Sequence, residues 1–409
     1  MKILVLNSGS SSIKFQLVET DVDMIASNTD RCLAKGTVER IGTDEASLRL
    51  EAGGKPFKPQ IGELLDHRSA LMEMLTALKE SGVIADITQV QAVGHRVVHG
   101  GEQFSHSVII DEEVAQAIQQ CSELAPLHNP HNLRGYYVAR KVMPQVPQVA
   151  VFDTAFHQSL PPRAYLYGIP YTYYRRYKIR RYGFHGTSHR YVAFRYRQLV
   201  GKGREDINLI TCHLGNGCSM TAIEKGKSVD TTMGFTPLEG LVMGTRSGDL
   251  DPAVVLYLMS KDELTLHDVT TLLNKFSGLY GLSGESNDMR ELLAASAKGD
   301  EQAKVAIEVF AYRIRRYIGA YTAAMGHVDA LIFTGGIGEN APAVRELACE
   351  RLAEMGFQVD PVRNQSMVGK EGEISTESSR ARVMVIPTNE ELLIARDTFR
   401  CVRGIEHPH

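Results

Sequence analysis

Apolar and polar positions along this chain form short blocks that predict strands and helices in turn. Two segments, 3–18 and 208–224, share one layout: an apolar strand, a turn rich in Gly, Ser and Asn, and a returning strand. Gly9 and Gly215 fall at matching places in the two segments. This degenerate repetition predicts two similar α/β domains that face each other.

Helical periodicity is strongest at 301–325, and Asp251-Pro252 opens a further helix because proline suits the first helical position. Residues 360–379 are polar and contain glycine, which predicts a surface loop of little functional importance. Strands alternating with helices predict α/β layers. The other predicted elements are helices at 67–81 and 111–125 and strands at 91–94, 148–152, 330–334 and 382–386.

Composition excludes several classes of protein. The 409 residues are 43% hydrophobic and 23% charged, with a net charge of −3, so neither global disorder nor a basic nucleic-acid or membrane surface is expected. The six cysteines are scattered, which argues against a disulfide framework. Only four apolar residues separate Lys2 from Asn7, too few for a signal peptide, and no segment has transmembrane length. We expect a soluble cytoplasmic protein with no nucleic-acid or membrane partner.

Three glycine-rich turns, at 7–14, 213–217 and 335–340, each follow a short apolar strand. Glycine allows a tight turn and lets backbone N–H groups approach an anion. The pattern G-x-x-x-x-G-K-S/T is absent, so this is not a Walker A protein. Turns of this kind spread over the whole chain indicate a nucleotide held from several sides, as in phosphoryl transfer.

The third turn also permits a different interpretation. Residues 336–341 fit the dinucleotide fingerprint G-x-G-x-x-A, and Asp360 lies at about the spacing of a ribose-binding acid. That element alone would predict a nicotinamide-dependent oxidoreductase. However, it lies in the last quarter of the chain and leaves the other two turns without a role.

Arg96, His185 and Arg246 each lie among small residues in glycine-containing segments. Three such groups could surround a transferring phosphoryl group, whose transition state spreads charge over three oxygens. Zinc held by histidine pairs such as His185 and His189 is the alternative. H-E-x-x-H is absent, and the intervening Gly and Thr make a helical pair doubtful.

Carboxylates follow two of the predicted strands. Asp153 ends an apolar strand, where a carboxylate is well placed for chemistry in an α/β sheet, although a helix cap is an equal alternative. Glu390 or Glu391 could bind Mg²⁺, which prefers oxygen ligands. The tyrosine- and arginine-rich segment 171–182 is short, so we interpret it as a solvated face or a subunit contact rather than a nucleic-acid strip.

Together these motifs resemble the acetate kinase family over nearly the whole chain and in family order. The matching segments are 3–14, 95–101, 127–130, 152–157, 182–189, 213–217, 244–252, 334–340 and 388–392. The resemblance implies an α/β fold of two domains with a duplicated ribonuclease H-like, actin-like ATPase core and an interdomain cleft. It implies an N-terminal domain of 1–156 plus 389–409, with a returning C-terminal helix, a nucleotide-binding domain of 157–388, and a homodimer.

The resemblance also implies a role for each matching residue. Asn7 and Glu390 would organise Mg²⁺, with Mn²⁺ as a substitute. Arg96 would bind the substrate carboxylate, Asp153 would be the catalytic acidic residue, and His185 and Arg246 would stabilise the transition state. The acyl pocket would be walled by Val98, Leu127, Phe184 and Pro237. ATP would be bound by Lys14, His213, Leu214, Gly215, Asn216, Gly217, Asp288, Met289, Arg290, Gly336, Ile337, Gly338, Glu339 and Asn340.

The implied reaction is reversible, in-line transfer of the ATP γ-phosphoryl group to acetate, giving acetyl phosphate and ADP. Propionate or another short-chain acid is the alternative acceptor. Acetate is already ionised at pH 7 and needs no general base, so we interpret Asp153 as an orienter of Mg²⁺-bound water or of a catalytic arginine. A non-catalytic, assembly-forming relative of the actin type would not need Arg96, His185 and Arg246 together.

Overall fold

A computed structural model describes residues 1–59, 62–126 and 128–406 of the chain. The chain divides into two compact units. Unit 1 contains residues 1–156 and 389–409, and unit 2 contains residues 157–388. Unit 2 is therefore an insertion between two segments of unit 1, and each unit is described by itself below.

Unit 1 is built on an eight-stranded sheet in the order β5-β4-β3-β2-β1-β6-β8-β7. The first five strands form an antiparallel meander, β6 and β8 run parallel to β1, and β7 is antiparallel to β8. The strands are β1 (Lys2–Ser8), β2 (Ile13–Glu19), β3 (Arg31–Glu39), β4 (Ser47–Ala52), β5 (Lys55–Phe57), β6 (Ala92–Val97), β7 (Val108–Ile109) and β8 (Gln148–Phe152).

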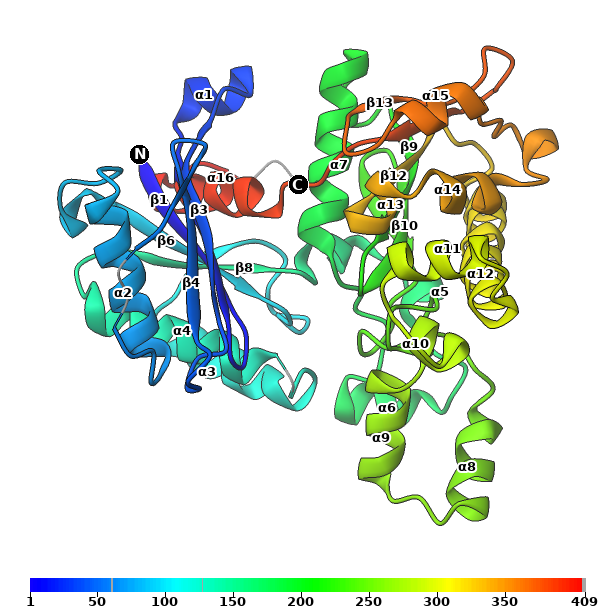
Figure 1. The fold of residues 1–409 in the computed structure, drawn as a ribbon, viewed down its shortest axis with the longest axis horizontal. Coiled ribbons are helices and arrows are strands. Elements are labelled where there is room, and N and C mark those ends of the chain that lie inside the picture. The colour runs from blue at the N-terminus through cyan, green and yellow to red at the C-terminus, as the bar shows by residue number, and fades with distance from the viewer. Residues whose placement is uncertain (60–61, 127, 407–409) are drawn as a thin grey trace. The chain divides into compact units, whose positions relative to one another are not determined.

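Helices cover both faces of this sheet because side chains alternate along β1. Leu4 and Leu6 pack in one core with α2 (His67–Glu80) and α4 (Asn129–Val142), whereas Ile3 and Val5 pack with α16 (Glu390–Arg403). Figure 1 shows the red α16, from the end of the chain, beside the blue β1. The remaining helices of unit 1 are α1 (Val22–Ser27) and α3 (Glu112–Gln120).

Unit 2 repeats the same strand pattern in a six-stranded sheet of order β11-β10-β9-β12-β14-β13. The hairpin strands β11, β10 and β9 are antiparallel, and β12 and β14 follow in parallel, as β3, β2, β1, β6 and β8 do in unit 1. The predicted duplication is therefore confirmed. The strands are β9 (Asn208–Leu214), β10 (Cys218–Glu224), β11 (Lys227–Thr231), β12 (Ala330–Thr334), β13 (Gly372–Glu373) and β14 (Arg382–Val385).

Helices α7 and α12 pack against β9 of this sheet, and α10, α11 and α14 pack against α12. The helices of unit 2 are α5 (Pro162–Tyr165), α6 (Tyr171–Tyr177), α7 (Gly186–Val200), α8 (Pro252–Lys261), α9 (Leu266–Lys275), α10 (Gly278–Ser283), α11 (Met289–Ala297), α12 (Glu301–Met325), α13 (Gly335–Asn340), α14 (Pro342–Cys349) and α15 (Pro361–Ser366).

One sequence interpretation is wrong. Residues 360–379 are not a featureless loop, because Asp360 caps α15 by accepting hydrogen bonds from the backbone N–H of Val362 and Arg363, and β13 follows. The doubt about a helical pair of His185 and His189 is confirmed, because His185 precedes α7 with a left-handed backbone and only His189 lies within the helix. Within the described ranges, no helix is both long and apolar enough to cross a bilayer.

Candidate active site

Polar side chains lie where the parallel strands of unit 1 end. Asn7 is at the end of β1, Arg96 is near the end of β6, and Asp153 directly follows β8. The backbone N–H of Asp153 donates to the carbonyl of Val97 at 3.0 Å, which fixes the ends of β6 and β8 together. Lys14 is the cross-strand partner of Asn7 in the β1–β2 hairpin. The carboxyl ends of neighbouring parallel strands thus bring the predicted residues to one edge of the sheet.

A forked ion pair joins Arg96 to Asp153. Nε of Arg96 donates to both carboxylate oxygens at 3.0 and 3.1 Å, and its Nη2 donates to Oδ2 at 2.7 Å. The Asp153 side chain is only 2% exposed, so this pair is shielded from screening by water. Burial alone would lower the pKa of the Arg96 guanidinium, but the charges of Asp153 and Glu390 outweigh it and raise that pKa. Asp153 therefore fixes the direction of the Arg96 guanidinium.

Two glutamates occupy the first turn of α16. The Asn389 side chain caps the helix by accepting from the backbone N–H of Leu392 at 3.1 Å, and Glu390 Oε2 lies 3.8 Å from Arg96 Nη2. Carboxylates at a helix N-terminus are favoured by its dipole. Burial, and then the charge of Glu390, raise the pKa of Glu391. Because α16 packs against β1, β6 and β8, it places the carboxylates of Glu390 and Glu391 at the same sheet edge.

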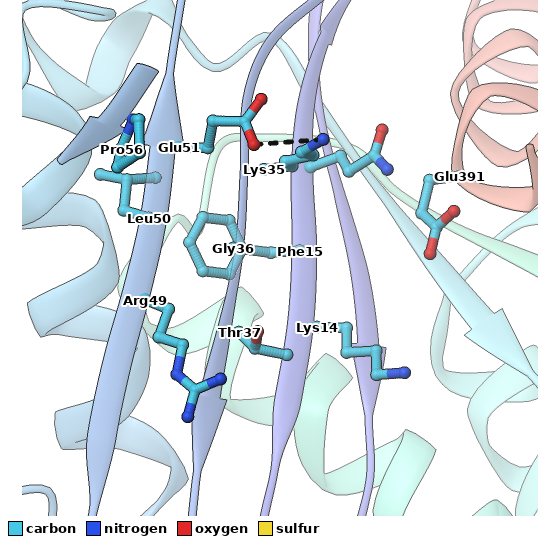
Figure 2. Close-up of a pocket in the computed structure, with 11 residues that line it drawn as sticks. Lys14, Phe15, Lys35, Gly36, Thr37, Arg49, Leu50, Glu51, Pro56 and Glu391 are labelled. Carbon is cyan, nitrogen blue, oxygen red and sulfur yellow. Dashed lines mark ion pairs between the residues drawn. The ribbon is translucent and has the colours of Figure 1, made fainter. Parts of the chain in front are cut away.

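A shallow groove of about 430 Å³ runs over the antiparallel strands of unit 1 (Figure 2). Lys14 and Glu391 lie at one end of it, while Arg49 and Leu50 lie farther along. A Cβ on Gly36 would be 2.3 Å from the Arg49 carbonyl and 2.5 Å from the Phe15 ring, so only glycine fits there. Lys14 is exposed in β2, so its side chain projects from the sheet rather than into its core.

In unit 2, the turn 213–217 joins β9 to β10, and two other glycine-containing segments, at Gly335 and Gly244, contact it closely. Gly335, at φ +78°, approaches so closely that a Cβ would lie 2.7 Å from the Leu214 carbonyl. A Cβ on Gly244 would lie 2.0 Å from Oδ1 of Asn216, and its N–H donates to the Asn216 carbonyl at 2.9 Å. Glycine is required at both contacts, and two of the three glycine-rich turns predicted from the sequence, 213–217 and 335–340, meet here.

His185 and Arg246 converge on the open side of that turn. A Cβ built on Gly217 would lie 3.4 Å from Nε2 of His185 and 3.6 Å from Nη1 of Arg246, so both groups border the space that this glycine leaves. Nη1 of Arg246 also donates to the Pro237 carbonyl at 3.0 Å. His185 has φ +54°, a strained conformation for a non-glycine residue.

A cavity of about 770 Å³ opens beside the same turn. Eight residues expected at the nucleotide line it: Gly215, Asn216, Asp288, Met289, Arg290, Gly336, Ile337 and Asn340. Asn287, Leu293, Ala341 and Val368 also line it and were missed. Val368 belongs to the segment 360–379 that the sequence interpretation set aside. The sequence did not indicate that Val368 lines a cavity, because one apolar side chain in a polar segment gives little signal.

The other expected nucleotide residues of unit 2 do not line this cavity but support its walls. Oε1 of Glu339 accepts from the N–H of Gly335 at 2.8 Å and of Thr388 at 3.1 Å, which holds the start of α13. Gly338 and Leu214 are buried, and His213 packs against His185 with ring centroids 4.3 Å apart and ring planes tilted by 31°.

Arg290 forms a forked ion pair with Asp288, with Nη2 to Oδ2 at 2.6 Å. Hydrogen bonds from the Arg290 side chain and backbone lower the pKa of Asp288. The pair fixes the start of α11 at the cavity rim, because Asp288 also caps that helix.

The expected acyl-pocket residues are distributed over both units. Val98 in unit 1 is buried, and its N–H donates to Asn132 Oδ1 at 3.1 Å. Phe184 in unit 2 is 1% exposed, and Pro237 is positioned by its bond to Arg246. Leu127 lies outside the described residues.

The zinc alternative is not supported by the geometry. His189 contacts the hydroxyls of Thr211 and Ser219, each at 2.7 Å. Across the described part of the chain, no group of three or more His, Cys, Asp or Glu side chains could hold a metal ion. Two oxygen ligands completed by phosphate and water, as expected for Mg²⁺, would not form such a group.

A model of the acetokinase family matches residues 2–396. The chain belongs to the acetokinase family. It is similar to the acetate kinase of Thermotoga maritima, with 54% identity over 99% of this chain and 100% of that protein. A crystal structure of Porphyromonas gingivalis acetate kinase matches with a TM-score of 0.92 and 44% identity over 98% of this chain and 99% of that one.

A propionate kinase from Francisella tularensis is also similar, with a TM-score of 0.90 and 41% identity over 99% of this chain and 100% of that one. Membership of the acetokinase family makes the chain a phosphotransferase with a carboxyl group as acceptor and ATP as co-substrate. The oxidoreductase and actin-type alternatives are therefore wrong.

Proposed function

We propose that the enzyme transfers the γ-phosphoryl group of ATP to acetate and releases acetyl phosphate and ADP, reversibly. A carboxylate oxygen forms a bond to the γ-phosphorus, and the bond from that phosphorus to the β–γ bridging oxygen breaks. The observation that carries the proposal is the placement of His185 Nε2 and Arg246 Nη1 around the open space at Gly217. Two donors beside a glycine turn suit the charge that develops on the transferring group.

The nucleotide would occupy the cavity of unit 2. Its volume of about 770 Å³ lies within the range of small-molecule sites. Gly215, Asn216 and the start of α13 would hold phosphates through backbone N–H groups. Asp288, Met289 and Arg290 would contact the nucleoside end. Lys14 would supply a cation to the phosphates from unit 1.

Arg96 would bind the acceptor carboxylate, and Asp153 would act through it. Because acetate has no proton to lose at pH 7, the Asp153 carboxylate is not needed as a base. Its two-point contact with Arg96 instead fixes the direction of the guanidinium. This supports the interpretation of Asp153 as an orienter of an arginine.

Mg²⁺ would be held by the side-chain oxygens of Asn7 and Glu390. Mg²⁺ keeps several waters and is usually held by one or two carboxylates together with substrate phosphates, so a small set of oxygen donors fits it. When bound it would neutralise charge on the phosphates, and Mn²⁺ should substitute for it. Both residues belong to unit 1, on β1 and on the helix that packs against β1.

The size of the acyl wall favours acetate over propionate. Val98 is branched and buried, and the difference of one methylene in an apolar pocket is worth about 1–3 kcal/mol. Propionate should therefore be a poorer substrate rather than an excluded one. A propionate kinase among the similar structures keeps that acceptor as the alternative.

A homodimer is the expected assembly, and α8 offers an apolar face for it. None of the residues of α8 is buried, although the helix reads Pro-Ala-Val-Val-Leu-Tyr-Leu-Met-Ser-Lys, and Leu256 and Tyr257 are 69% and 62% exposed. Replacing Leu256 with Glu should yield a monomer by light scattering. We place the enzyme in the cytoplasm, because the six cysteines, all within the described ranges, are free thiols.

The test uses purified protein, Mg-ATP and a series of short carboxylic acids, with hydroxylamine to trap acyl phosphate as hydroxamate. Hydroxamate that forms best with acetate is the expected result. A higher kcat/KM for propionate would replace the acceptor, and ATP binding without hydroxamate from any acid would refute the kinase proposal.

A further inference from the structure

A chain of polar side chains runs beneath His185 inside unit 2. Nδ1 of His185 lies 2.9 Å from the Ser219 hydroxyl, which also lies 2.7 Å from Nε2 of His189. Nδ1 of His189 lies 2.7 Å from the Thr211 hydroxyl. Thr211, His189 and Ser219 are all completely buried. The chain connects β9, the first turn of α7 and β10 to the ring beside Gly217.

The direction of the hydrogen bonds follows from proton counting. The Thr211 hydroxyl has one proton, and its alternative acceptor, the Thr221 carbonyl, is 3.5 Å away, so it donates to His189 at 2.7 Å. Burial first, and then the charges of His157 and His213, lower the pKa of His189 well below 6.5, so this ring is neutral. Its one proton is then on Nε2 and is donated to Ser219.

Ser219 accepts from His189 and has its own proton left to donate. Because Nδ1 of His185 is the other partner of this hydroxyl, that nitrogen accepts the bond and carries no proton. A neutral imidazole without a proton on Nδ1 carries it on Nε2.

We propose that Thr211, His189 and Ser219 are positioning residues that hold His185 neutral, with its proton on the nitrogen that borders Gly217. The inference rests on the proposed phosphoryl transfer and adds how His185 takes part in it. His185 then donates a hydrogen bond to an oxygen of the transferring group and does not act as a base.

The arrangement fits the chemistry of a carboxylate acceptor. No proton has to be removed from the attacking oxygen, so a histidine at this point is useful only as a donor. The opposite tautomer would direct a lone pair at negatively charged phosphoryl oxygens. The strained backbone of His185 indicates that the ring is held by its surroundings rather than by its local preference.

The first test is ¹⁵N NMR of the whole protein labelled at its histidine rings, without substrates and at neutral pH. The His185 signals are identified by their loss in His185→Asn. An unprotonated Nδ1 together with an N–H coupling at Nε2 is expected. A proton on Nδ1, alone or with one on Nε2, would overturn the inference. Because no substrate is present, this result does not depend on whether acetate is the acceptor.

The second test compares two buried threonines in adjacent strands. Thr211→Val removes the hydroxyl at the start of the chain, whereas Thr221→Val removes one that contacts Thr231 instead. Thr211→Val should lower kcat about threefold with KM values unchanged, and Thr221→Val should leave both unchanged. Equal kcat values for the two variants would contradict the inference.

Ser219 provides the largest expected effect in this series. Ser219→Ala should lower kcat about tenfold with little change in KM, because His185 loses the donor that fixes its tautomer. Ser219→Thr keeps the hydroxyl and should restore most of the activity. If wild-type protein forms no hydroxamate, the proposed function fails, and the NMR result still decides the tautomer.

Discussion

Arg96 in unit 1 and Arg246 in unit 2 are held in opposite ways. Arg96 is clamped by the Asp153 carboxylate and lies near Glu390, whereas Arg246 donates to the Pro237 carbonyl. No ion pair of Arg246 with a carboxylate is present among the described residues of unit 2, and burial lowers the pKa of its guanidinium. Carboxylates thus offset the positive charge of Arg96 but not that of Arg246.

The difference shows what each arginine can do for an anion. An arginine already paired with a carboxylate presents a fixed direction more than net charge, which suits a substrate carboxylate that must be aligned. An arginine held by a neutral carbonyl keeps its full charge for a group whose negative charge grows during the reaction. Unit 1 would therefore provide orientation and unit 2 would provide charge.

The largest expected effect comes from removing the unneutralised charge. Arg246→Ala should lower kcat about a thousandfold or more, as loss of a transition-state arginine does in other phosphoryl transfers. Arg246→Lys should recover only part of it, because an ammonium lacks the fork. The hydroxamate assay measures both, and a loss under tenfold in Arg246→Ala would remove this arginine from the transition state.

Breaking the clamp in unit 1 should affect orientation and stability together. Asp153→Asn should lower kcat about a hundredfold and raise the KM for acetate, because Arg96 loses its fixed direction. The free energy of unfolding should fall by about 3 kcal/mol, since a buried ion pair loses one of its two charges. Urea denaturation and the acid-series assay measure these effects.

Glu51→Gln is the control for Asp153→Asn, because it breaks the exposed Lys35–Glu51 pair of the same unit and should change neither quantity. If Asp153→Asn instead abolished one titrating limb of the kcat profile, Asp153 would be a proton-transfer group and not an orienter.

A smaller effect is expected when the space between the donors of unit 2 is filled. Gly217→Ala places a methyl group 3.4 Å from His185 and 3.6 Å from Arg246. Both are ordinary van der Waals distances, so the fold should accommodate the methyl group. We expect about a tenfold loss of kcat/KM for ATP with an unchanged melting temperature, because the methyl would occupy the position proposed for a phosphoryl oxygen.

Gly168→Ala, where an added Cβ meets no atom within 4 Å, is the matched control for Gly217→Ala and should retain full activity. A wild-type kcat/KM in Gly217→Ala would show that the phosphoryl group does not approach this turn.

The smallest effect concerns the acyl chain. Val98→Ala should raise the propionate-to-acetate ratio of kcat/KM about tenfold, because one wall group is removed. The neighbouring Val97→Ala makes the same change in the hydrophobic core, and should lower stability without altering the ratio. An unchanged ratio in Val98→Ala would exclude this side chain from the acyl wall.

Local patterns predicted the hairpins, the helix 301–325 and the strands 148–152 and 330–334, which the structure contains at those positions. Here apolar periodicity and burial agree. Strands β3, β4 and β5 were missed because their outer faces are exposed and polar, so their apolar residues are intermittent. The doubt about a helical pair of His185 and His189 is confirmed, because α7 begins only after His185.

The candidate site was predictable where glycine or charge has a specific task. The turns at Gly215 and Gly336, and the acidic and cationic residues at strand ends, follow from their residue types. The sequence did not identify Ser219 as a site residue, since a single serine in a predicted strand has no distinctive pattern. Its relation to His185 and His189 arises only when β10 and α7 are brought together, which no local pattern encodes.

The insertion of unit 2 into unit 1 determines the order in which a ribosome can complete them. All of unit 2 has been synthesised before α16 begins. Helix α16 supplies Glu390 and one side of the core at β1, and its buried Arg396 pairs with Asp30, a residue synthesised before any part of unit 2. Unit 1 therefore has one face of its sheet uncovered until α16 has been synthesised. Nascent chains halted before residue 389 should contain a folded unit 2 and an incomplete unit 1, whose exposed strands are a target for chaperones.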